Sequence, residues 1–188
     1  MRTLIMDTST NLLYISFIEN DKVIYEVKTL GLNNHSDHLL NLIEKGLNEC
    51  NLQVKDFNKI VIGVGPGAYT GLRVSMSVAK MFSWTLNIPL YSISSLDLLT
   101  SGYKNDGSYV ISFKAKKGYV YSKKFEIVNG NKENISNEEF ISLEQLDIEN
   151  HTVITHDEMN IDCLNIKDNE CKLVSNIHAL EPNYLRDC

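Results

Sequence analysis

The stretch Gly65-Pro66-Gly67-Ala68-Tyr69-Thr70-Gly71-Leu72-Arg73 decides the fold, because it joins a short apolar segment to a long apolar-rich one. Residues 59–64 predict a strand, and the apolar spacing over residues 70–86 predicts a helix buried on more than one side. Glycine permits backbone angles that other residues avoid, and a helix N-terminus presents unpaired N–H groups to an anion or a partner. On spacing alone, a purely structural tight turn is favoured.

This glycine loop does not match the common nucleotide-binding motifs. No Gly-Lys-Ser/Thr follows it, so it is not a Walker loop, and its Gly-x-Gly-x-x-x-Gly spacing is a poor dinucleotide fingerprint. Residues 3–6, 13–18 and 23–27 precede it and predict a three-stranded meander, with Asn20-Asp21 as its second turn. A meander does not start the β-α-β unit that a dinucleotide fold requires.

The remaining pattern predicts a two-lobed α/β protein. In the first lobe, residues 1–102, a helix over 36–49 capped by Ser36 and a strand over 90–93 are expected, and Ser94 or Ser95 caps a helix ending at Leu99. A hinge over 101–107 leads to a smaller second lobe, residues 103–188. That lobe is expected to contain a hairpin of 109–114 and 119–128, a helix over 136–146 with Glu138 and Glu139 in its first turn, and a strand over 153–155.

Composition narrows the class of protein. The chain has 188 residues, of which 43% are hydrophobic and 22% charged, as expected for a folded protein. We expect a cytoplasmic location, because the sequence contains neither a signal peptide nor an apolar run of about 18 residues. The net charge of -6 disfavours broad binding of nucleic acid. Lys114, Lys116 and Lys117 form a local basic exception, for which a solvated strand edge is the favoured interpretation.

The polar stretch Asp7-Thr8-Ser9-Thr10 ends the first predicted strand. A carboxylate followed by hydroxyls is suited to face a phosphate or its magnesium ion. An Asx or Ser/Thr turn explains the same four residues equally well. His35 and His38 have a spacing that can pair two metal ligands, but a solvated start of the helix is favoured and no metal site is predicted.

Three segments together resemble the TsaB (YeaZ) family: Asp7-Thr8-Ser9-Thr10, the loop from Gly65 to Arg73, and the ending Pro182-Asn183-Tyr184-Leu185-Arg186. The resemblance is clear over residues 1 to about 100 and patchy beyond, at residues 118–121 and at the C-terminal Tyr-Leu-Arg. It implies an actin-like ATPase fold (ASKHA, RNase H-like) with two lobes, of which the second is abbreviated in this chain.

The resemblance also implies a function. The chain would be a non-catalytic adaptor that supports a TsaD-type transferase, which adds a threonylcarbamoyl group to adenosine 37 of tRNA. A TsaE-type ATPase would join the complex, tRNA would be bound only through the complex, and the adaptor alone would form a homodimer. An older name for the family is glycoprotease-like (M22).

Two departures from the family bear on cofactors. Lys114 precedes Ala115 where family members often have Asp, and an ammonium group does not ligate magnesium. No Gly-Gly pair is present to hold an adenosine. We therefore expect no cofactor in the isolated chain, and ATP with magnesium only at a joint between subunits. The residues that would take part in such a shared contact are Asp7, Ser9, Thr10, Gly65, Pro66, Gly67, Thr70, Gly71 and Arg73.

The helices over 36–49 and 70–86 are the predicted docking surface for the transferase, where they would form a helical bundle across the two chains. Leu39, Ile43, Met76 and Lys80 are the predicted interface residues, with Leu39 and Met76 as apolar anchors. The alternative hypothesis is a minimal ATPase or small-molecule kinase that acts alone through Asp7 and the glycine loop. A metallopeptidase is the least favoured, because it requires a catalytic metal and the His-x-x-x-His spacing that TsaD-type subunits use for theirs is absent. No Ser-His-Asp or Cys-His arrangement can be read from the spacing either.

Overall fold

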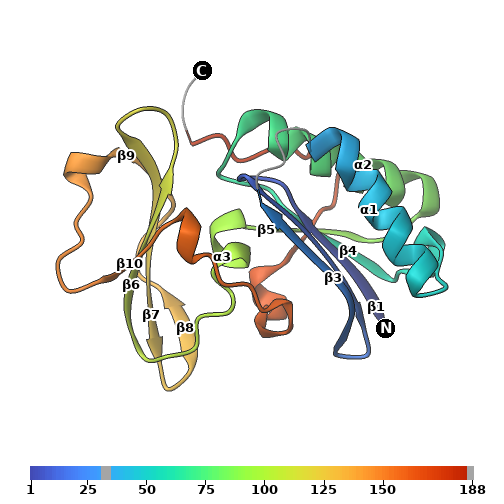
Figure 1. Cartoon of the computed structure of the whole chain (residues 1–188), viewed down its shortest axis with the longest axis horizontal. Helices are drawn as coiled ribbons and strands as arrows, with labels where there is room; N and C mark the ends of the chain where they lie inside the picture. Colours follow the sequence, from blue (N-terminus) through green and yellow to red (C-terminus); the bar gives the residue numbers. More distant parts are fainter. Residues whose placement is uncertain (31–34, 186–188) are drawn as a thin grey trace.

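Two β-sheets build the protein, as Figure 1 shows for the computed structural model, which describes residues 1–30 and 35–185. The first sheet has six strands in the order β11-β5-β4-β1-β2-β3. Its bounds are β1 (Arg2–Asp7), β2 (Leu12–Glu19), β3 (Lys22–Leu30), β4 (Lys59–Gly63), β5 (Leu90–Ile93) and β11 (Lys172–Leu173). Strands β1, β4 and β5 run parallel, while β2 and β3 extend the sheet as an antiparallel meander. The predicted meander is therefore confirmed.

The turn between β2 and β3 follows the chemistry of its residues. Asn20 and Asp21 have φ angles of 47° and 60°. Asn and Asp tolerate this left-handed region better than other non-glycine residues, and paired positive φ values match the twist of a tight hairpin.

Helices α1 (His35–Glu49) and α2 (Tyr69–Leu86) cover one face of the first sheet. Their apolar sides join β1, β2 and β4 in one buried cluster that includes Leu4, Phe17, Ile43, Ile62 and Ala79. Both helices confirm the predicted segments. The prediction that Ser36 caps α1 is wrong, because the helix begins one residue earlier and Ser36 lies inside it.

A second core joins the two sheets. The short helix α3 (Ser95–Leu99) lies between them, with Ser94 at its N-cap as predicted. Its leucines pack with Ile5 and Tyr14 from the first sheet and with Ile111 and Phe125 from the second. The two sheets therefore share one apolar interior.

The second sheet is formed by β10-β6-β7-β8, with β9 paired to β7. Its bounds are β6 (Gly107–Lys114), β7 (Tyr119–Val128), β8 (Asn131–Asn134), β9 (Glu139–Ser142) and β10 (Thr152–Ile154). The predicted hairpin and the strand near 153–155 are confirmed. The predicted helix over 136–146 is wrong, because this segment pairs with β7 and continues as a short 3₁₀ turn, Leu143–Gln145. Phe140 stacks on Tyr119 there, and this cross-strand aromatic pair stabilises the strand.

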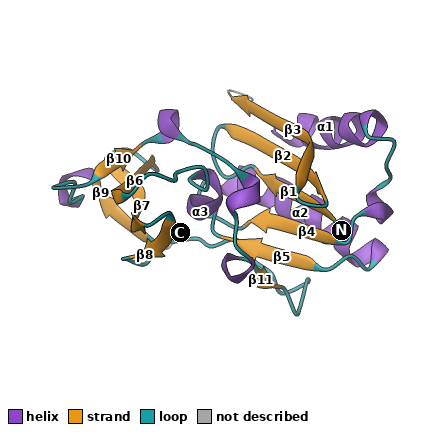
Figure 2. Cartoon of the chain, turned by 90° about the horizontal axis from the view of Figure 1, so that it is seen from below, coloured by secondary structure: helices purple, strands orange, loops and turns teal. Residues whose placement is uncertain are grey.

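The C-terminal part of the chain returns to the first sheet. Strand β11 pairs with β5 at the edge of the first sheet (Figure 2). Residues 174–185, here called the C-terminal strap, then contact α2 through His178 and Tyr184. Val174, Ile177 and Leu180 pack into the α1/α2 core, and Leu185 reaches the core between the sheets. The predicted second lobe, 103–188, therefore differs from the structure in its last part. Arg186, from the predicted C-terminal motif, lies outside the described residues.

Neither α2 nor any other helix in residues 1–30 and 35–185 combines the length and the apolar character that crossing a bilayer requires.

Candidate functional site in the cleft between the sheets

The first hairpin holds its polar residues in an internal network. Asp7 is completely buried at the end of β1, and its carboxylate accepts hydrogen bonds from the backbone N–H of Ser9 at 2.7 Å and from the Ser9 hydroxyl at 2.6 Å. The hydroxyl of Ser95 donates a third hydrogen bond at 2.6 Å. The carboxylate that the sequence offered as a phosphate or magnesium contact is therefore engaged within the protein.

The glycine loop is tied to this hairpin through its backbone. The N–H of Ala68 donates to the carbonyl of Ser9 at 2.6 Å. A Cβ atom on Gly67 would lie 2.3 Å from that same carbonyl oxygen, so only glycine permits this close approach. The N–H of Gly65 donates to the hydroxyl of Ser95, which links the loop to α3 as well. The Gly65-Pro66 peptide bond is cis.

A cleft of about 510 Å³ opens where the hairpin, the glycine loop and the second sheet meet. The turn between β1 and β2, the glycine loop and the first turn of α2 contribute most of the predicted shared-contact residues. These are Ser9, Thr10, Pro66, Gly67, Thr70 and Gly71. Asp7 lies behind the wall of the cleft, Gly65 lines a different cavity, and Arg73 lies outside on the surface of α2. The structure thus brings together six of the nine predicted residues.

The second sheet supplies the opposite wall of the cleft, with Phe113, Tyr121 and His156 beside the cations Lys114 and Lys116. The Nδ1 atom of His156 accepts a hydrogen bond from the backbone N–H of Lys114 at 3.1 Å. Burial, with a smaller contribution from the charge of Lys114, lowers the pKa of His156 below its usual value. The neutral imidazole is therefore favoured, and the positive charge of the cleft comes from its lysines.

The chemistry of this cleft fits an anion better than a metal ion. Lysine ammonium groups, hydroxyls and the N-terminal turn of α2 are donors or positive dipoles. The Asp7 carboxylate that a magnesium ion would need is buried in hydrogen bonds. Within residues 1–30 and 35–185, His, Cys, Asp and Glu side chains form no group of three or more that could hold a metal.

Several residues of the cleft and of the buried network behind it were missed by sequence reasoning. Ser95 bridges Asp7 and the glycine loop but follows Asp7 by 88 residues, so no local spacing indicates it. Phe113, Tyr121 and His156 come from strands and turns of the second sheet. The resemblance at residues 118–121 is the signal that was available for Tyr121. Strand pairing across the chain, which local patterns do not report, brings the other side chains here.

The surface of α2 carries an aromatic and arginine cluster. Tyr69 stacks on Tyr184 of the strap with a centroid separation of 5.2 Å, and the Arg73 guanidinium lies 4.2 Å from the centre of the Tyr69 ring. Nε of Arg73 donates to the Tyr184 hydroxyl at 3.0 Å, and this hydrogen bond raises the pKa of Arg73. Lys80 donates to the carbonyl of His178. The strap therefore covers one flank of α2 with specific contacts.

Three of the predicted interface residues are wrong as docking anchors. Leu39, Ile43 and Met76 are buried in the core that α1 and α2 share with the first sheet. A side chain packed there cannot contact another protein unless the core opens. The helical periodicity identified the apolar faces correctly, but those faces point inward. Lys80 is half-buried and engaged with the strap.

A family model described as "TsaD: tRNA N6-adenosine threonylcarbamoyltransferase" matches residues 29–173. The chain is 37% identical over 131 residues to the tRNA threonylcarbamoyladenosine biosynthesis protein TsaB of Bacillus subtilis. The matched residues make up 69% of this chain and 57% of that relative. The protein of the same name from Buchnera aphidicola subsp. Schizaphis graminum is 32% identical over 122 residues, covering 63% and 57%. The chain therefore spans somewhat more than half the length of these curated relatives.

Among solved structures, YeaZ from Pseudomonas aeruginosa superimposes with a TM-score of 0.70 at 22% identity, covering 79% of this chain and 70% of that one. A structure described as an uncharacterized protein with similarity to peptidase YeaZ, also from Pseudomonas aeruginosa, gives a TM-score of 0.72 at 19% identity, covering 86% and 81%. At these identities the likeness concerns the fold. The predicted α/β fold class is confirmed, and the arrangement of the two sheets and their helices is that of the YeaZ structures.

Proposed function

The chain belongs to the protein family that the TsaD model describes, and within it to the TsaB (YeaZ) relatives, and on this premise we propose that it is a non-catalytic adaptor in tRNA threonylcarbamoyladenosine formation. Its partner would be a TsaD-type transferase, with a TsaE-type ATPase joining the complex. Adenosine 37 of tRNA would be the substrate of the complex, bound only through it. We place this activity in the cytoplasm.

The observation that carries the adaptor proposal is the use of the family motifs for internal structure. Asp7 accepts its hydrogen bonds from Ser9 and Ser95, and Thr8 donates to the carbonyl of Gly71 at 2.6 Å. A catalytic carboxylate must reach the substrate directly or through one water, in an accessible position. The buried Asp7 instead fixes the hairpin, the glycine loop and α3 as a rigid unit. This arrangement favours a scaffold over a reaction centre.

The proposed docking surface is the outward side of α1 and α2. Leu40, Met81 and Trp84 are 45%, 46% and 60% exposed there. Large apolar side chains of this kind act as anchors when a partner removes them from water. They replace Leu39, Ile43 and Met76 as the proposed contact residues. When the transferase is absent, we propose that the same surface pairs with a second copy as a two-fold dimer.

A nucleotide contact at the joint between subunits is compatible with the cleft. Ser9, Thr10 and Thr70 supply hydroxyls, and Lys114 and Lys116 supply positive charge. Because the chain's own carboxylate is engaged, the magnesium ion of such a nucleotide would need ligands from the partner or from water. The cleft therefore supports a shared anion contact in the complex and argues against a stand-alone ATPase.

Affinity purification from the native cell tests the adaptor proposal. We expect a tagged chain to recover a TsaD-type protein, and we expect Leu40→Glu to reduce that recovery. Failure of the tagged chain to recover the transferase, together with ATP turnover by the purified chain alone, would support the minimal ATPase or kinase instead.

A further inference from the structure

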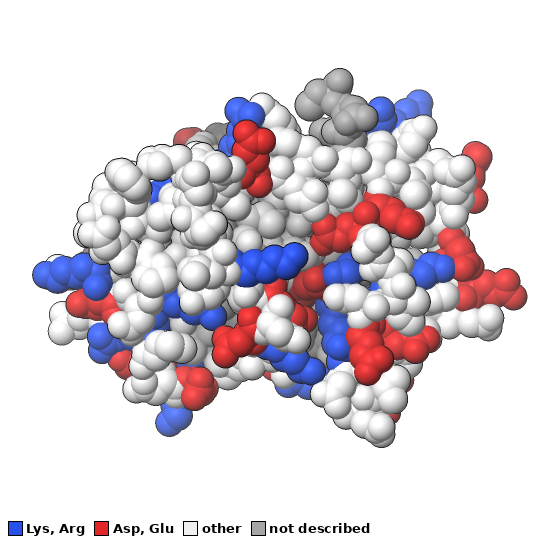
Figure 3. Space-filling view, turned by 180° about the vertical axis from the view of Figure 1, so that it is seen from behind, with Lys and Arg blue, Asp and Glu red and all other residues white. Residues whose placement is uncertain are grey.

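A second cavity lies on the other side of the glycine loop, on the face that Figure 3 shows, where positive and negative side chains gather along the junction of the two lobes. Its volume is about 790 Å³. Gly65 lines this cavity, while the next residues of the loop line the cleft described above. The two cavities have no lining residue in common, so they are separate sites.

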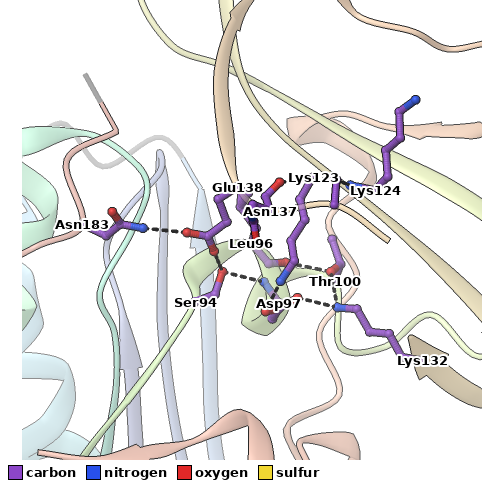
Figure 4. Close-up of polar contacts among 11 residues, drawn as sticks. Ser94, Leu96, Asp97, Thr100, Lys123, Lys124, Lys132, Asn137, Glu138 and Asn183 are labelled. Carbon is purple, nitrogen blue, oxygen red and sulfur yellow. Dashed lines mark hydrogen bonds and ion pairs between the residues drawn. The ribbon is translucent and has the colours of Figure 1, made fainter. Parts of the chain in front are cut away.

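The charged centre of this cavity is one carboxylate held by two lysines (Figure 4). Nζ of Lys123 lies 2.6 Å from Oδ2 of Asp97, and Nζ of Lys132 lies 2.9 Å from Oδ1. The side chains of Asp97, Lys123 and Lys132 are only 10%, 7% and 15% exposed. Burial opposes ionisation of Asp97, but the two ammonium groups outweigh it and lower its pKa. The centre therefore holds two positive charges against one negative charge.

Glu138 is the other buried carboxylate of the cavity. It accepts hydrogen bonds from the Ser94 hydroxyl and from Nδ2 of Asn183, the latter at 2.6 Å. Both carboxylate oxygens of Glu138 thus accept hydrogen bonds from neutral groups, one from Ser94 and one from Asn183. Burial raises the pKa of Glu138, while the charge of Lys123 opposes that shift.

The rest of the lining adds positive charge and neutral donors. Lys167, Lys172 and Glu170 also line the cavity. With Lys123, Lys132, Asp97 and Glu138, this makes four lysines and three carboxylates around it. Asn134, Asn137 and Asn169 supply amide groups. Ammonium groups outnumber carboxylates, and the two most buried of them share Asp97.

A buried cationic surplus is costly unless a counter-ion accompanies it. Each ammonium group has three donors; Asp97 takes one from Lys123 and one from Lys132, and the Thr100 hydroxyl accepts a second from Lys132 at 3.3 Å. The volume lies within the range of small-molecule sites. We propose that this cavity binds a small polyanion, a metabolite that carries either phosphate groups or several carboxylates, between Lys123, Lys132 and Lys172.

Isothermal titration calorimetry of the full chain at low ionic strength tests the proposal, with inorganic pyrophosphate as one probe and citrate as the other. We expect at least one probe to bind, and the probe that binds identifies a phosphate or a carboxylate ligand. Lys132→Gln should weaken binding by about tenfold or more, because it removes one charge-assisted contact. Lys172→Gln, at an exposed position, should also weaken it and keeps the test valid if Lys132→Gln fails to fold.

Lys55→Gln is the control for charge alone, because it removes an exposed lysine that lines neither cavity. This variant should bind the probe as the unmodified chain does. Lys114→Gln removes a lysine of the other cleft and reports whether the probe binds there instead. The proposal is overturned if neither probe binds. It is also overturned if Lys114→Gln abolishes binding while Lys132→Gln and Lys172→Gln do not, or if Lys55→Gln weakens binding as much as Lys132→Gln does.

Discussion

The hydroxyl of Thr8 donates a 2.6 Å hydrogen bond to the backbone carbonyl of Gly71, which connects the first hairpin to the first turn of α2. With the hydrogen bond from Ala68 N–H to the Ser9 carbonyl, it makes the hairpin and the glycine loop one structural unit. The two sequence motifs that most resemble nucleotide-binding elements therefore hold each other in place.

Asp7→Ala should destabilise the fold strongly. The substitution leaves the Ser9 and Ser95 donors without their charged acceptor in a buried site. We expect the free energy of unfolding to fall by about 3 kcal/mol, measured by urea denaturation. The control Glu44→Ala, at an exposed site on α1, should change it by less than about 0.5 kcal/mol. An Asp7→Ala protein of unchanged stability would contradict a structural role for this carboxylate.

Gly67→Ala should separate the loop from the hairpin. The added methyl group would meet the Ser9 carbonyl at 2.3 Å, and backbone atoms must move to admit it. We expect a loss of about 2 to 3 kcal/mol in the free energy of unfolding. Gly118→Ala is the matched comparison, because its Cβ meets nothing within 4 Å and only its positive φ is unfavourable. That variant should lose about 1 to 2 kcal/mol, and equal losses in both would argue against the close contact.

Substitutions at the neighbouring residues Leu39 and Leu40 of α1 distinguish an effect on docking from an effect on folding. Leu40→Glu places a charge on the exposed side and should leave the melting temperature nearly unchanged while weakening transferase binding by about 2 kcal/mol or more. Leu39→Glu places the charge in the core and should prevent folding. Binding is measured by surface plasmon resonance with the purified transferase. If Leu40→Glu and Met81→Glu both bind as the unmodified chain does, the α1/α2 surface is not the interface.

Glu138 should give the protein a specific pH dependence. Its pKa is raised by burial against the opposing effects of Ser94 and Lys123, so the folded protein binds this proton more tightly than the unfolded chain. The stability that protonated Glu138 contributes is therefore fully present below the pKa that this residue has in the unfolded chain. It is lost as the pH rises through the pKa of Glu138 in the folded protein. We expect the unfolding free energy of the unmodified chain, relative to Glu138→Gln, to fall as pH rises from about 4.5. A constant or rising difference would contradict the raised pKa.

Local sequence patterns predicted the first sheet and its helices well. The helical spacing in α1 and α2 reflects one buried face each, and the apolar run of β2 reflects burial of both faces of that strand. They failed at residues 136–146, where Glu138 and Glu139 looked like the first turn of a helix. Glu138 instead accepts hydrogen bonds from Ser94 and Asn183, and Phe140 stacks across the sheet on Tyr119. Contacts between distant segments outweighed local propensity there.

The same limit applies to the sites. The apolar positions Leu39 and Met76 were identified correctly as a helical face, but periodicity cannot tell a core from an interface. The residues of the cleft that lie on the glycine loop and the first hairpin were found from their motifs. Ser95 and His156, and the centre formed by Asp97 with its two lysines, depend on chain reversals that bring distant strands together.

Reconstituted tRNA modification tests the central claim most directly. Threonylcarbamoyladenosine is quantified by mass spectrometry after tRNA reacts with an activated threonylcarbamoyl donor, ATP and the TsaD-type and TsaE-type proteins, with and without this chain. We expect product only when the chain is present with the transferase, because the chain supplies a docking surface and the transferase supplies the reacting groups. Formation of product by the chain without the transferase, or equal product when the chain is left out, would contradict the account.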